Sequence, residues 1–365
     1  ASFGTLASPS WRGLTSSWPS LRLDAARTPT RQIHDRAVMI AASILSALPA
    51  APPSPGPCDI YASAGTPCVA AHSMTRSLFA NYSGPLYLVQ RSSDLASDVV
   101  VVKEGLAAVA SQDAFCAGTN CTVTRIFDQT ERGNHLNRAP WGGASKHSER
   151  GVNAARHKLS VGGRTVYGAY FEGGMGYRCD STWGVATGND PETMYMVTAG
   201  RHYNGGCCFD YGNAEIDALD HGKGTMEAIY WGDSKGWSRG AGDGPWVMAD
   251  IENGLWAGKD KVEASNTPIT GAEFVTAMVK GGSNGFALLG GDATRSDGLK
   301  KLYEGPRPPK YQPMKKQGAI ILGIGGDSSD WAVGTFYEGV VTAGYASDAT
   351  DKAVHANIVA AGYGR

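Results

Sequence analysis

The sequence predicts an all-β protein built as a sandwich of sheets, with only a few short helices. The chain contains 49 glycines and 18 prolines among 365 residues, and each glycine inside a helix costs about 1 kcal/mol relative to alanine. Hydrophobic residues make up 42% and charged residues 18%, so a sizeable core can form and wholesale disorder is excluded. Short aromatic or β-branched segments recur between Gly, Asn and Asp turns, which is typical of strands without crossover helices.

The expected elements follow the chain in order. Apolar residues at helical spacing predict a helix over residues 73–82. Short runs bounded by turn residues then predict strands over 122–128, 164–171, 193–198, 225–231, 245–251, 273–280, 319–323 and 334–342. A second helix is predicted over residues 348–361. No internal repeat is present, and we expect residues 58–365 to form one domain.

The N-terminal part is expected to be a disordered leader over residues 1–57. Within it, residues 37–48 form an apolar run of 12 residues preceded by Arg31 and Arg36. This is the size of the hydrophobic part of a signal peptide and too short to cross a bilayer. A proline-rich linker follows at residues 52–57. We therefore expect the protein to be secreted.

The cysteines fit secretion. There are seven of them, Cys58, Cys68, Cys116, Cys121, Cys179, Cys207 and Cys208. The first four form two pairs that each bracket a short turn-rich loop, which predicts two local disulfides, although buried thiols are the alternative. A bond between the adjacent Cys207 and Cys208 would be uncommon. Cys179 is the odd one out and is expected to be free.

The expected surface is that of a glycoprotein without nucleic-acid partners. Sequons at Asn81 and Asn120 predict N-glycosylation. The 33 basic and 34 acidic residues give a net charge of −1, which argues against binding to nucleic acid or an anionic membrane through bulk charge. We expect no membrane partner and a monomeric protein.

Two carboxylates stand out in the strand predicted at 245–251. Side chains alternate along a strand, so odd-numbered residues from 247 to 251 should point into a core and even-numbered residues from 246 to 252 to the other face. Asp250 and Glu252 would then lie beside Trp246, an arrangement that suits sugar chemistry. The alternative is a solvated strand face with two ordinary acids.

A third carboxylate ends the stretch 319–327. The same alternation places Gly323 and Gly325 on one face with Asp327, and the glycines would clear space for a carboxyl group on a pocket floor. Glycosidases need two carboxyls across the scissile bond, roughly 5 Å apart for retention or 6.5–9.5 Å for inversion. A simple turn at the strand end is the alternative.

Competing patterns are weaker. Residues 236–240 match the G-x-S-x-G nucleophile elbow of esterases, but the elbow must open a helix and a helix-breaking sequence follows. The eight histidines show no HExxH or H-x-H spacing, so we expect no metal and no cofactor. Other acids are expected to be mostly structural or surface groups, namely Glu172, Glu215, Glu227 and Glu338.

Several longer stretches together resemble one family, the catalytic domain of fungal α-L-arabinofuranosidase B, glycoside hydrolase family 54. In chain order these are CDIY at 58, FDQTERGNHL at 127, CCFDYGNAE at 207, MEAIY at 226, GAGDGPW at 240, DIEN at 250, GAIILGIGGD at 318 and GTFYEG at 334. The resemblance covers about residues 57–363, and it identifies 58–365 as a catalytic domain.

The resemblance implies a two-layer β-sandwich of the concanavalin A-like jelly-roll type. It implies a retaining, exo-acting enzyme that releases terminal L-arabinofuranose from arabinan or arabinoxylan. Glu252 matches the family's nucleophile and must be ionised to attack. Asp327 matches the family's acid/base and must carry a proton when the glycosidic bond breaks, so an acidic optimum is expected.

The resemblance also assigns the remaining site residues. Asp250 and Asn253 match residues that hydrogen-bond the sugar, Trp237 matches a pocket aromatic, and Gly326 matches a backbone contact. Cys207 and Cys208 match a vicinal disulfide that stacks on the furanose ring. The family's other disulfides match Cys58–Cys68 and Cys116–Cys121, which leaves Cys179 unpaired.

Three departures from the family pattern are visible. Gly254 stands where the family commonly has a second Asn, and Trp331 is an extra aromatic after the acid. A C-terminal arabinose-binding β-trefoil module is not expected. Two alternatives remain open: a non-catalytic carbohydrate-binding sandwich, against which the retention of both carboxyls speaks, and a glycosidase with specificity changed toward β-xylosides or galactofuranosides.

Overall fold

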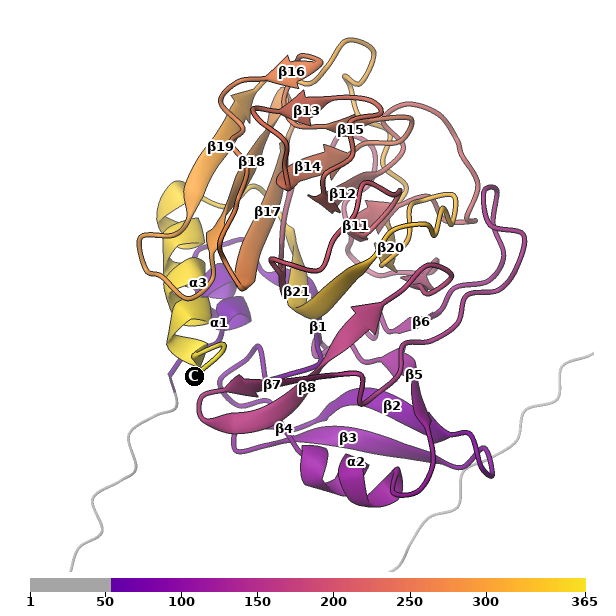
Figure 1. The fold of residues 1–365 in the computed structure, drawn as a ribbon. Helices are drawn as coiled ribbons and strands as arrows, with labels where there is room; N and C mark the ends of the chain where they lie inside the picture. The colour runs from indigo at the N-terminus through magenta and orange to yellow at the C-terminus, as the bar shows by residue number, and fades with distance from the viewer. Residues whose placement is uncertain (1–53) are drawn as a thin grey trace, which may run out of the picture. The chain divides into compact units, whose positions relative to one another are not determined.

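Two large antiparallel sheets dominate the computed structural model, which describes residues 54–365 (Figure 1). The apolar run at 37–48 lies outside the described residues. The sheets pack face to face, with β12 (Glu227–Gly232) and β14 (Trp246–Asp250) of one against β17 (Phe274–Gly282) and β18 (Gly285–Asp292) of the other. The predicted all-β, two-layer sandwich is therefore confirmed.

The first sheet has the strand order β19-β18-β17-β10-β21-β8-β7, with β1 also paired to β21. Its other strands are β1 (Cys68–Ser73), β7 (His157–Val161), β8 (Arg164–Phe171), β10 (Glu192–Ala199), β19 (Lys300–Gly305) and β21 (Gly334–Ala343). Strand β21 thus lies inside this sheet, between β8 and β10.

The second sheet has the order β15-β14-β12-β11-β20-β9-β6-β5-β2-β3-β4. Its other strands are β2 (Pro85–Arg91), β3 (Ser97–Lys103), β4 (Leu106–Ala107), β5 (Cys121–Ile126), β6 (Leu136–Arg138), β9 (Tyr177–Cys179), β11 (Asp210–Ala214), β15 (Leu255–Trp256) and β20 (Ala319–Leu322). A small parallel pair joins β13 (Arg239–Gly240) to β16 (Val262–Glu263).

The main core lies between the two sheets. Val247, Ala249 and Ile251 are fully buried in it, together with residues of β17 and β18. Trp246 and Met248, on the opposite face of β14, belong to a separate buried cluster that includes Cys208. The alternation predicted for this strand is confirmed from Trp246 to Ile251, whereas Glu252 lies beyond the end of β14 in a turn. Burial of a Val or Ile side chain contributes about 1.5–3 kcal/mol.

The predicted C-terminal helix is confirmed at both ends as α3 (Asp348–Ala361). Ser347 caps its first turn through the side chain, and Gly362 ends it in the left-handed conformation. The helix packs beside β17, where the buried Lys280 donates to Asp351 at 2.5 Å. Two shorter helices are α1 (Pro57–Ser63) and α2 (Val109–Phe115).

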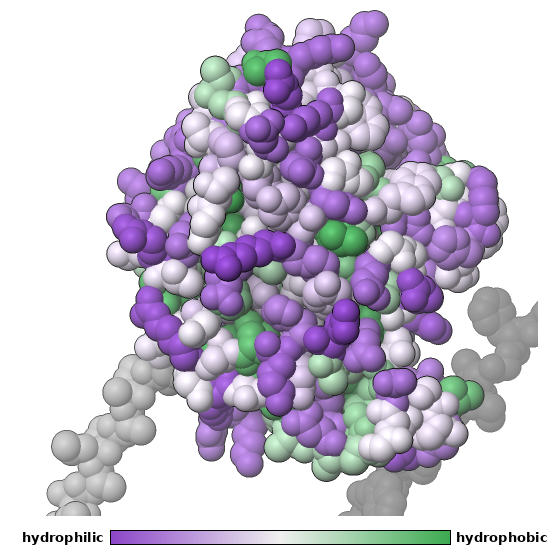
Figure 2. Space-filling model, viewed as in Figure 1, coloured by the Kyte–Doolittle hydropathy of each residue, from purple (hydrophilic) through white to green (hydrophobic). Residues whose placement is uncertain are grey.

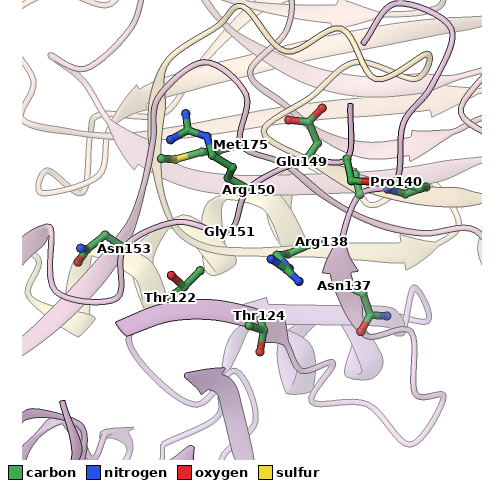
Figure 3. Close-up of a pocket in the computed structure, with 12 residues that line it drawn as sticks. Thr122, Thr124, Asn137, Arg138, Pro140, Glu149, Arg150, Gly151, Asn153 and Met175 are labelled. Atoms are coloured by element: carbon green, nitrogen blue, oxygen red, sulfur yellow. The ribbon is translucent and has the colours of Figure 1, made fainter. Parts of the chain in front are cut away.

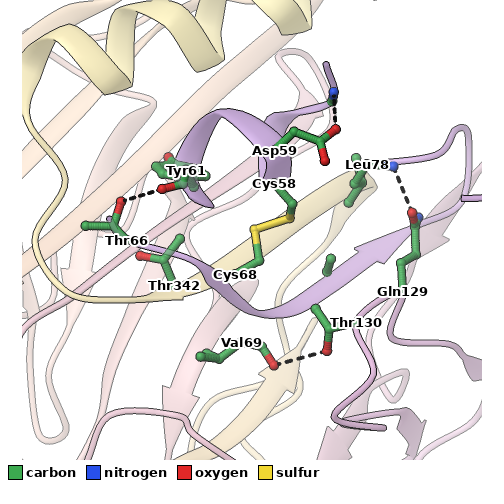
Figure 4. The surroundings of a disulfide bond; sticks show 12 residues. Cys58, Asp59, Tyr61, Thr66, Cys68, Val69, Leu78, Gln129, Thr130 and Thr342 are labelled. Atoms are coloured by element: carbon green, nitrogen blue, oxygen red, sulfur yellow. Dashed lines mark hydrogen bonds between the residues drawn. A yellow bond between two sulfur atoms is a disulfide. The ribbon is translucent and has the colours of Figure 1, made fainter. Parts of the chain in front are cut away.

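The helix predicted over residues 73–82 is wrong. Strand β1 ends at Ser73, whose hydroxyl oxygen accepts hydrogen bonds from the amides of Thr75 and Arg76 at 3.0 Å each. The amide of Leu78 donates to Oε1 of Gln129 at 2.7 Å (Figure 4). Because side chains satisfy these backbone donors, the chain turns irregularly while its apolar residues remain buried.

All three expected disulfides are present. Cys58–Cys68 ties α1 to the start of β1 (Figure 4), Cys116–Cys121 ties the end of α2 to the start of β5, and Cys207–Cys208 joins neighbours. Cys179 is free and half-buried, as predicted.

The visible surface is largely hydrophilic, with apolar residues in small separate spots (Figure 2). None of the helices in residues 54–365 combines the length and the apolar character that a bilayer crossing needs.

Candidate active site

The predicted site residues converge on one cavity of about 230 Å³. Its lining is Ala144, Cys207, Asp220, Trp237, Asp250, Glu252, Asn253, Gly254, Leu255, Gly326, Asp327, Ser329 and Trp331. Every catalytic and sugar-binding residue expected from the sequence is in this set except Cys208, which is buried beside Cys207. The structure therefore brings together residues from several stretches that are distant in the sequence, above all those around Cys207, Glu252 and Asp327.

A tight turn after β14 positions Glu252. Strand β14 ends at Asp250, which pairs with Leu255 of β15. Glu252 and Asn253 both have left-handed backbone angles, φ 60° and 55°, a conformation that is unfavourable for residues other than glycine. Three hydrogen bonds hold the turn. The Ile251 amide donates to the Gly254 carbonyl at 3.3 Å, the Glu252 amide to Oδ1 of Asp250 at 3.2 Å, and the Tyr311 hydroxyl to the carbonyl of Asn253 at 2.7 Å. Strained residues of this kind often mark functional sites.

A loop after β20 positions Asp327. The strand ends at Leu322, and Gly323 turns the chain with φ 80°, so the predicted alternation through Asp327 is wrong beyond that point. Oδ1 of Asp327 accepts from the Ser329 amide at 3.0 Å, and its carbonyl accepts from the Ala144 amide at 3.0 Å. The carboxyl reaches the cavity through this loop and not through strand geometry.

Gly326 leaves room for the carboxylates. A Cβ added there would lie 2.1 Å from Oε2 of Glu215 and 3.1 Å from Oε2 of Glu252. A side chain at this position would displace both acids. The clearance predicted for Gly323 and Gly325 differs from this one, since a Cβ on Gly325 would lie 3.6 Å from Oδ1 of Asp327 and a Cβ on Gly323 would meet Phe171.

The vicinal disulfide forms one wall of the cavity. Sγ of Cys208 lies 3.2 Å from Oδ2 of Asp250. The backbone of the Asp327 loop is joined to this wall, since the Trp331 amide donates to the Cys207 carbonyl at 3.0 Å and the Cys208 amide to the Ser329 carbonyl at 3.2 Å. The wall and the loop are thus held as one unit.

The cavity carries two exposed tryptophans and a restricted glycine. Trp237 is 41% exposed and Trp331 is 61% exposed, so both indoles are open to a bound molecule.

Gly254 has no room for a side chain. A Cβ on Gly254 would lie 2.3 Å from Nε1 of Trp256 and 2.8 Å from the Tyr311 hydroxyl. The Asn that the family commonly has at this position would require both aromatics to move.

Two acids that the sequence analysis did not assign to the site belong to its carboxyl cluster. Asp210 of β11 is fully buried beside Asp250, and Glu215 lies beside Glu252. Neither oxygen of Asp210 has a conventional donor within residues 54–365, and the same holds for Oε2 of Glu215. Of the four acids expected to be mostly structural or surface groups, Glu215 is thus the one that lies in the carboxyl cluster. Glu227 and Glu338 are structural, in buried pairs with Arg307 and Arg76, and Glu172 is exposed.

Burial raises the pKa of Glu252 to about 11, and the neighbouring Asp250 and Glu215 add to this effect. Burial likewise raises the pKa of Asp250 to about 7 and that of Glu215 above its ordinary value. The guanidinium of Arg178 is close, but it donates to backbone carbonyls of Glu215 and Gly326. The crowded carboxyls therefore share protons, which differs from the expectation that Glu252 is simply ionised.

A larger groove of about 820 Å³ lies along β5 and β6 (Figure 3). Thr122, Asn137 and Arg138 are among its lining residues, and Glu149 is the one acid there. A single carboxyl cannot perform paired acid/base chemistry, so the smaller cavity is the candidate active site.

Comparisons with known proteins identify the family. Residues 57–364 match the family model described as "Alpha-L-arabinofuranosidase B, catalytic". The chain is 53% identical over 315 residues to an α-L-arabinofuranosidase of Hypocrea jecorina, covering 84% of this chain and 63% of that protein. It is 52% identical over 316 residues to a probable α-L-arabinofuranosidase B of Aspergillus terreus, covering 84% of this chain and 62% of that protein. The chain thus spans less than two thirds of the length of these curated relatives.

Solved structures similar to this chain are also arabinofuranosidases. An arabinofuranosidase complexed with arabinofuranosyl-α-1,2-xylobiose is similar with a TM-score of 0.82 and 48% identity, covering 84% of this chain and 65% of that one. A glycoside hydrolase family 54 α-L-arabinofuranosidase soaked with a cyclic sulfate inhibitor is similar with a TM-score of 0.81 and 48% identity, covering 84% and 66%.

Proposed function

This chain belongs to the α-L-arabinofuranosidase B catalytic family, and from that premise we propose that it is a retaining, exo-acting α-L-arabinofuranosidase. Its substrates are terminal L-arabinofuranosyl side chains of arabinan and arabinoxylan. The observation that carries the proposal is the convergence of Glu252, Asp327 and the Cys207–Cys208 disulfide on one cavity.

The proposed reaction has two displacements. In the first, the Glu252 carboxylate bonds to the anomeric carbon while the glycosidic C–O bond breaks and Asp327 gives its proton to the leaving oxygen. In the second, Asp327 takes a proton from water, the water oxygen bonds to the anomeric carbon, and the ester bond to Glu252 breaks. Both residues return to their starting protonation states.

The other cavity residues would bind the sugar. Asp250 and Asn253 present polar atoms for the furanose hydroxyls, and Gly326 offers backbone. The disulfide provides an apolar plate for one face of the ring, and Trp237 provides an aromatic surface. A small cavity closed by a buried wall suits a single terminal sugar, which supports exo action.

Secretion is part of the proposal. Three disulfides persist most readily in an oxidising compartment. Asn81 and Asn120 are exposed, as glycan acceptors must be. We propose that both are glycosylated and that the secreted protein acts as a monomer.

The wild-type protein is expected to release nitrophenol from para-nitrophenyl α-L-arabinofuranoside and to give arabinose of retained configuration. Product configuration is read by NMR during the first minutes, before mutarotation. No turnover, with arabinose or arabinoxylan still bound in calorimetry, would identify a carbohydrate-binding sandwich instead. An inverted product would contradict the double displacement.

A second candidate is β-xyloside hydrolysis in the same cavity. One relative, 53% identical over 315 residues, is named arabinofuranosidase/β-xylosidase in Trichoderma koningii. Parallel assays with nitrophenyl β-D-xyloside and β-D-galactofuranoside rank the three sugars by kcat/KM. A higher value for either would move the assignment to that sugar.

Glu215→Gln is expected to shift the acidic limb of kcat/KM to lower pH by about one unit. The amide keeps an acceptor for the Thr225 hydroxyl, which now donates to Glu215 at 2.5 Å, and presents an N–H to Glu252. This hydrogen bond and the loss of a neighbouring acid favour ionised Glu252, so its pKa falls. The pH profile is compared with that of Glu172→Gln, an exposed acid. An unchanged limb would exclude coupling between Glu215 and Glu252.

A further inference from the structure

A second cluster of titratable side chains lies outside the active-site cavity. It consists of His147, Glu149 and Asp330, whose nearest ligand atoms all lie within 4.8 Å of one another. Nε2 of His147 is 3.1 Å from Oδ2 of Asp330. Figure 3 shows Glu149 pointing away from Thr122 and Thr124 of the groove.

The two carboxylates of this cluster are buried, and within residues 54–365 neither forms a salt bridge with a lysine or arginine. Glu149 is 3% exposed and Asp330 is 5% exposed. Neither oxygen of Glu149 has a hydrogen-bond partner within the part of the chain that the structure describes. The adjacent Arg150 donates instead to the Gly173 carbonyl at 2.7 Å. A buried carboxylate without a hydrogen-bond partner, close to a second buried carboxylate, is strongly unfavourable unless something positive lies between them.

The hydrogen bonds of His147 leave its Nε2 as a third electron-pair donor beside the two carboxylates. The Ser145 hydroxyl oxygen lies 3.2 Å from Nδ1 of His147 and 3.2 Å from its carbonyl oxygen. A hydroxyl that donates to the carbonyl accepts from Nδ1–H, and this tautomer leaves the lone pair of Nε2 facing Asp330. An outer hydrogen bond of this kind commonly fixes a metal-binding imidazole.

We propose that His147, Glu149 and Asp330 bind one divalent transition-metal ion of the zinc type. One imidazole and two carboxylates are zinc ligands, and tetrahedral bonds of about 2.0–2.2 Å place such donors roughly 3.3–3.6 Å apart. The His147–Asp330 distance of 3.1 Å is close to this value. Two carboxylate charges match a divalent ion, and the His147 side chain, 58% exposed, leaves an entry path and room for water.

The role of the ion would be structural. His147 and Glu149 lie in the loop over residues 139–151, which also carries Ala144 of the cavity lining. Asp330 lies in the loop that carries Asp327, and the Asp330 carbonyl accepts from the Gly174 amide at 3.0 Å. An ion bound at this cluster would therefore link these two loops of the active site. The proposal stands on these residues and does not depend on the proposed glycosidase activity.

The test is made on the full chain after removal of metal with EDTA. Titration with zinc chloride is expected to give one zinc per chain by elemental analysis. At about one hundred times the dissociation constant, the melting temperature should rise by about 5 °C. Calcium and magnesium are expected to give smaller shifts because a histidine ligand suits them poorly.

Two variants and one matched control separate the proposal from a metal-free ion pair. Glu149→Gln and Asp330→Asn should each abolish the bound zinc and its thermal shift. Asp217→Asn should keep both, since it disrupts the exposed pair between His221 and Asp217, 3.0 Å apart, which has no third ligand. Glu149→Gln also removes a buried charge, so it should fold without metal. Absence of bound zinc in the wild type, or an equal shift in Glu149→Gln, would overturn the proposal.

Discussion

Replacing Glu252 by glutamine is expected to lower kcat on para-nitrophenyl α-L-arabinofuranoside by at least about a thousandfold. The amide has nearly the same volume as the carboxyl, so the turn after β14 and the cavity should remain. What is lost is the oxygen nucleophile that forms the glycosyl ester. KM should change far less than kcat, because the proposed sugar contacts of Asp250, Asn253 and the disulfide would remain. Steady-state kinetics, with circular dichroism as a check on folding, measure this split.

Chemical rescue distinguishes a nucleophile from a residue that only supports the fold. In Glu252→Ala, azide can enter the space of the missing carboxyl and attack the anomeric carbon directly. The expected product is the arabinosyl azide of inverted configuration, with the rate rising with azide concentration. A variant that keeps a tenth or more of the wild-type kcat would refute Glu252 as the nucleophile.

Asp327→Asn is expected to have an effect that depends on the leaving group. Proton donation contributes about 10²–10⁴-fold in rate, and it matters most when the leaving oxygen is a sugar alkoxide. The variant should therefore lose about this much kcat/KM on arabinoxylo-oligosaccharides. With the dinitrophenyl arabinoside, whose leaving group needs little protonation, the first displacement should be nearly spared.

The measurement is the ratio of the two kcat/KM values in the variant and in the wild type. If Asp327 only held the loop in place, both substrates would suffer equally and the ratio would stay constant. Ser329→Ala serves as a loop control, because the backbone amide of residue 329 still donates to Asp327.

Regular strands are the part of this protein that sequence predicts well. Strand β14 is short and fully buried. Its side chains alternate between the two faces of the sheet, so the faces of Val247 and Trp246 follow from their sequence positions alone. Strand β18 was missed because three of its eight residues are glycine. The structure explains them by close packing, since a Cβ on Gly290 would lie 2.8 Å from Cγ2 of Val247 on the facing sheet.

The site could be predicted to the extent that its residues lie in motifs. Asp210 carries a usable signal, because it is the first residue of β11 and stands two residues after Cys208. Glu215 does not, since it lies beyond the end of β11, where alternation no longer applies. Motif spacing cannot predict the cluster of His147, Glu149 and Asp330. Asp330 is far from the other two residues in the sequence, and only folding brings it close to them.

The position of β21 has a consequence for biosynthesis. This strand pairs with β1, β8 and β10, yet it follows all three of them in the chain and leaves the ribosome after them. Until β21 has been synthesised, its place between β8 and β10 in the first sheet is empty. The backbone of both strands is then unpaired there, and apolar residues are uncovered. Contacts of such large sequence separation make folding slow and the nascent chain prone to aggregation. The first sheet therefore cannot be completed before β21 has been synthesised, and the folding yield should depend on chaperones that shield the half-built sheet.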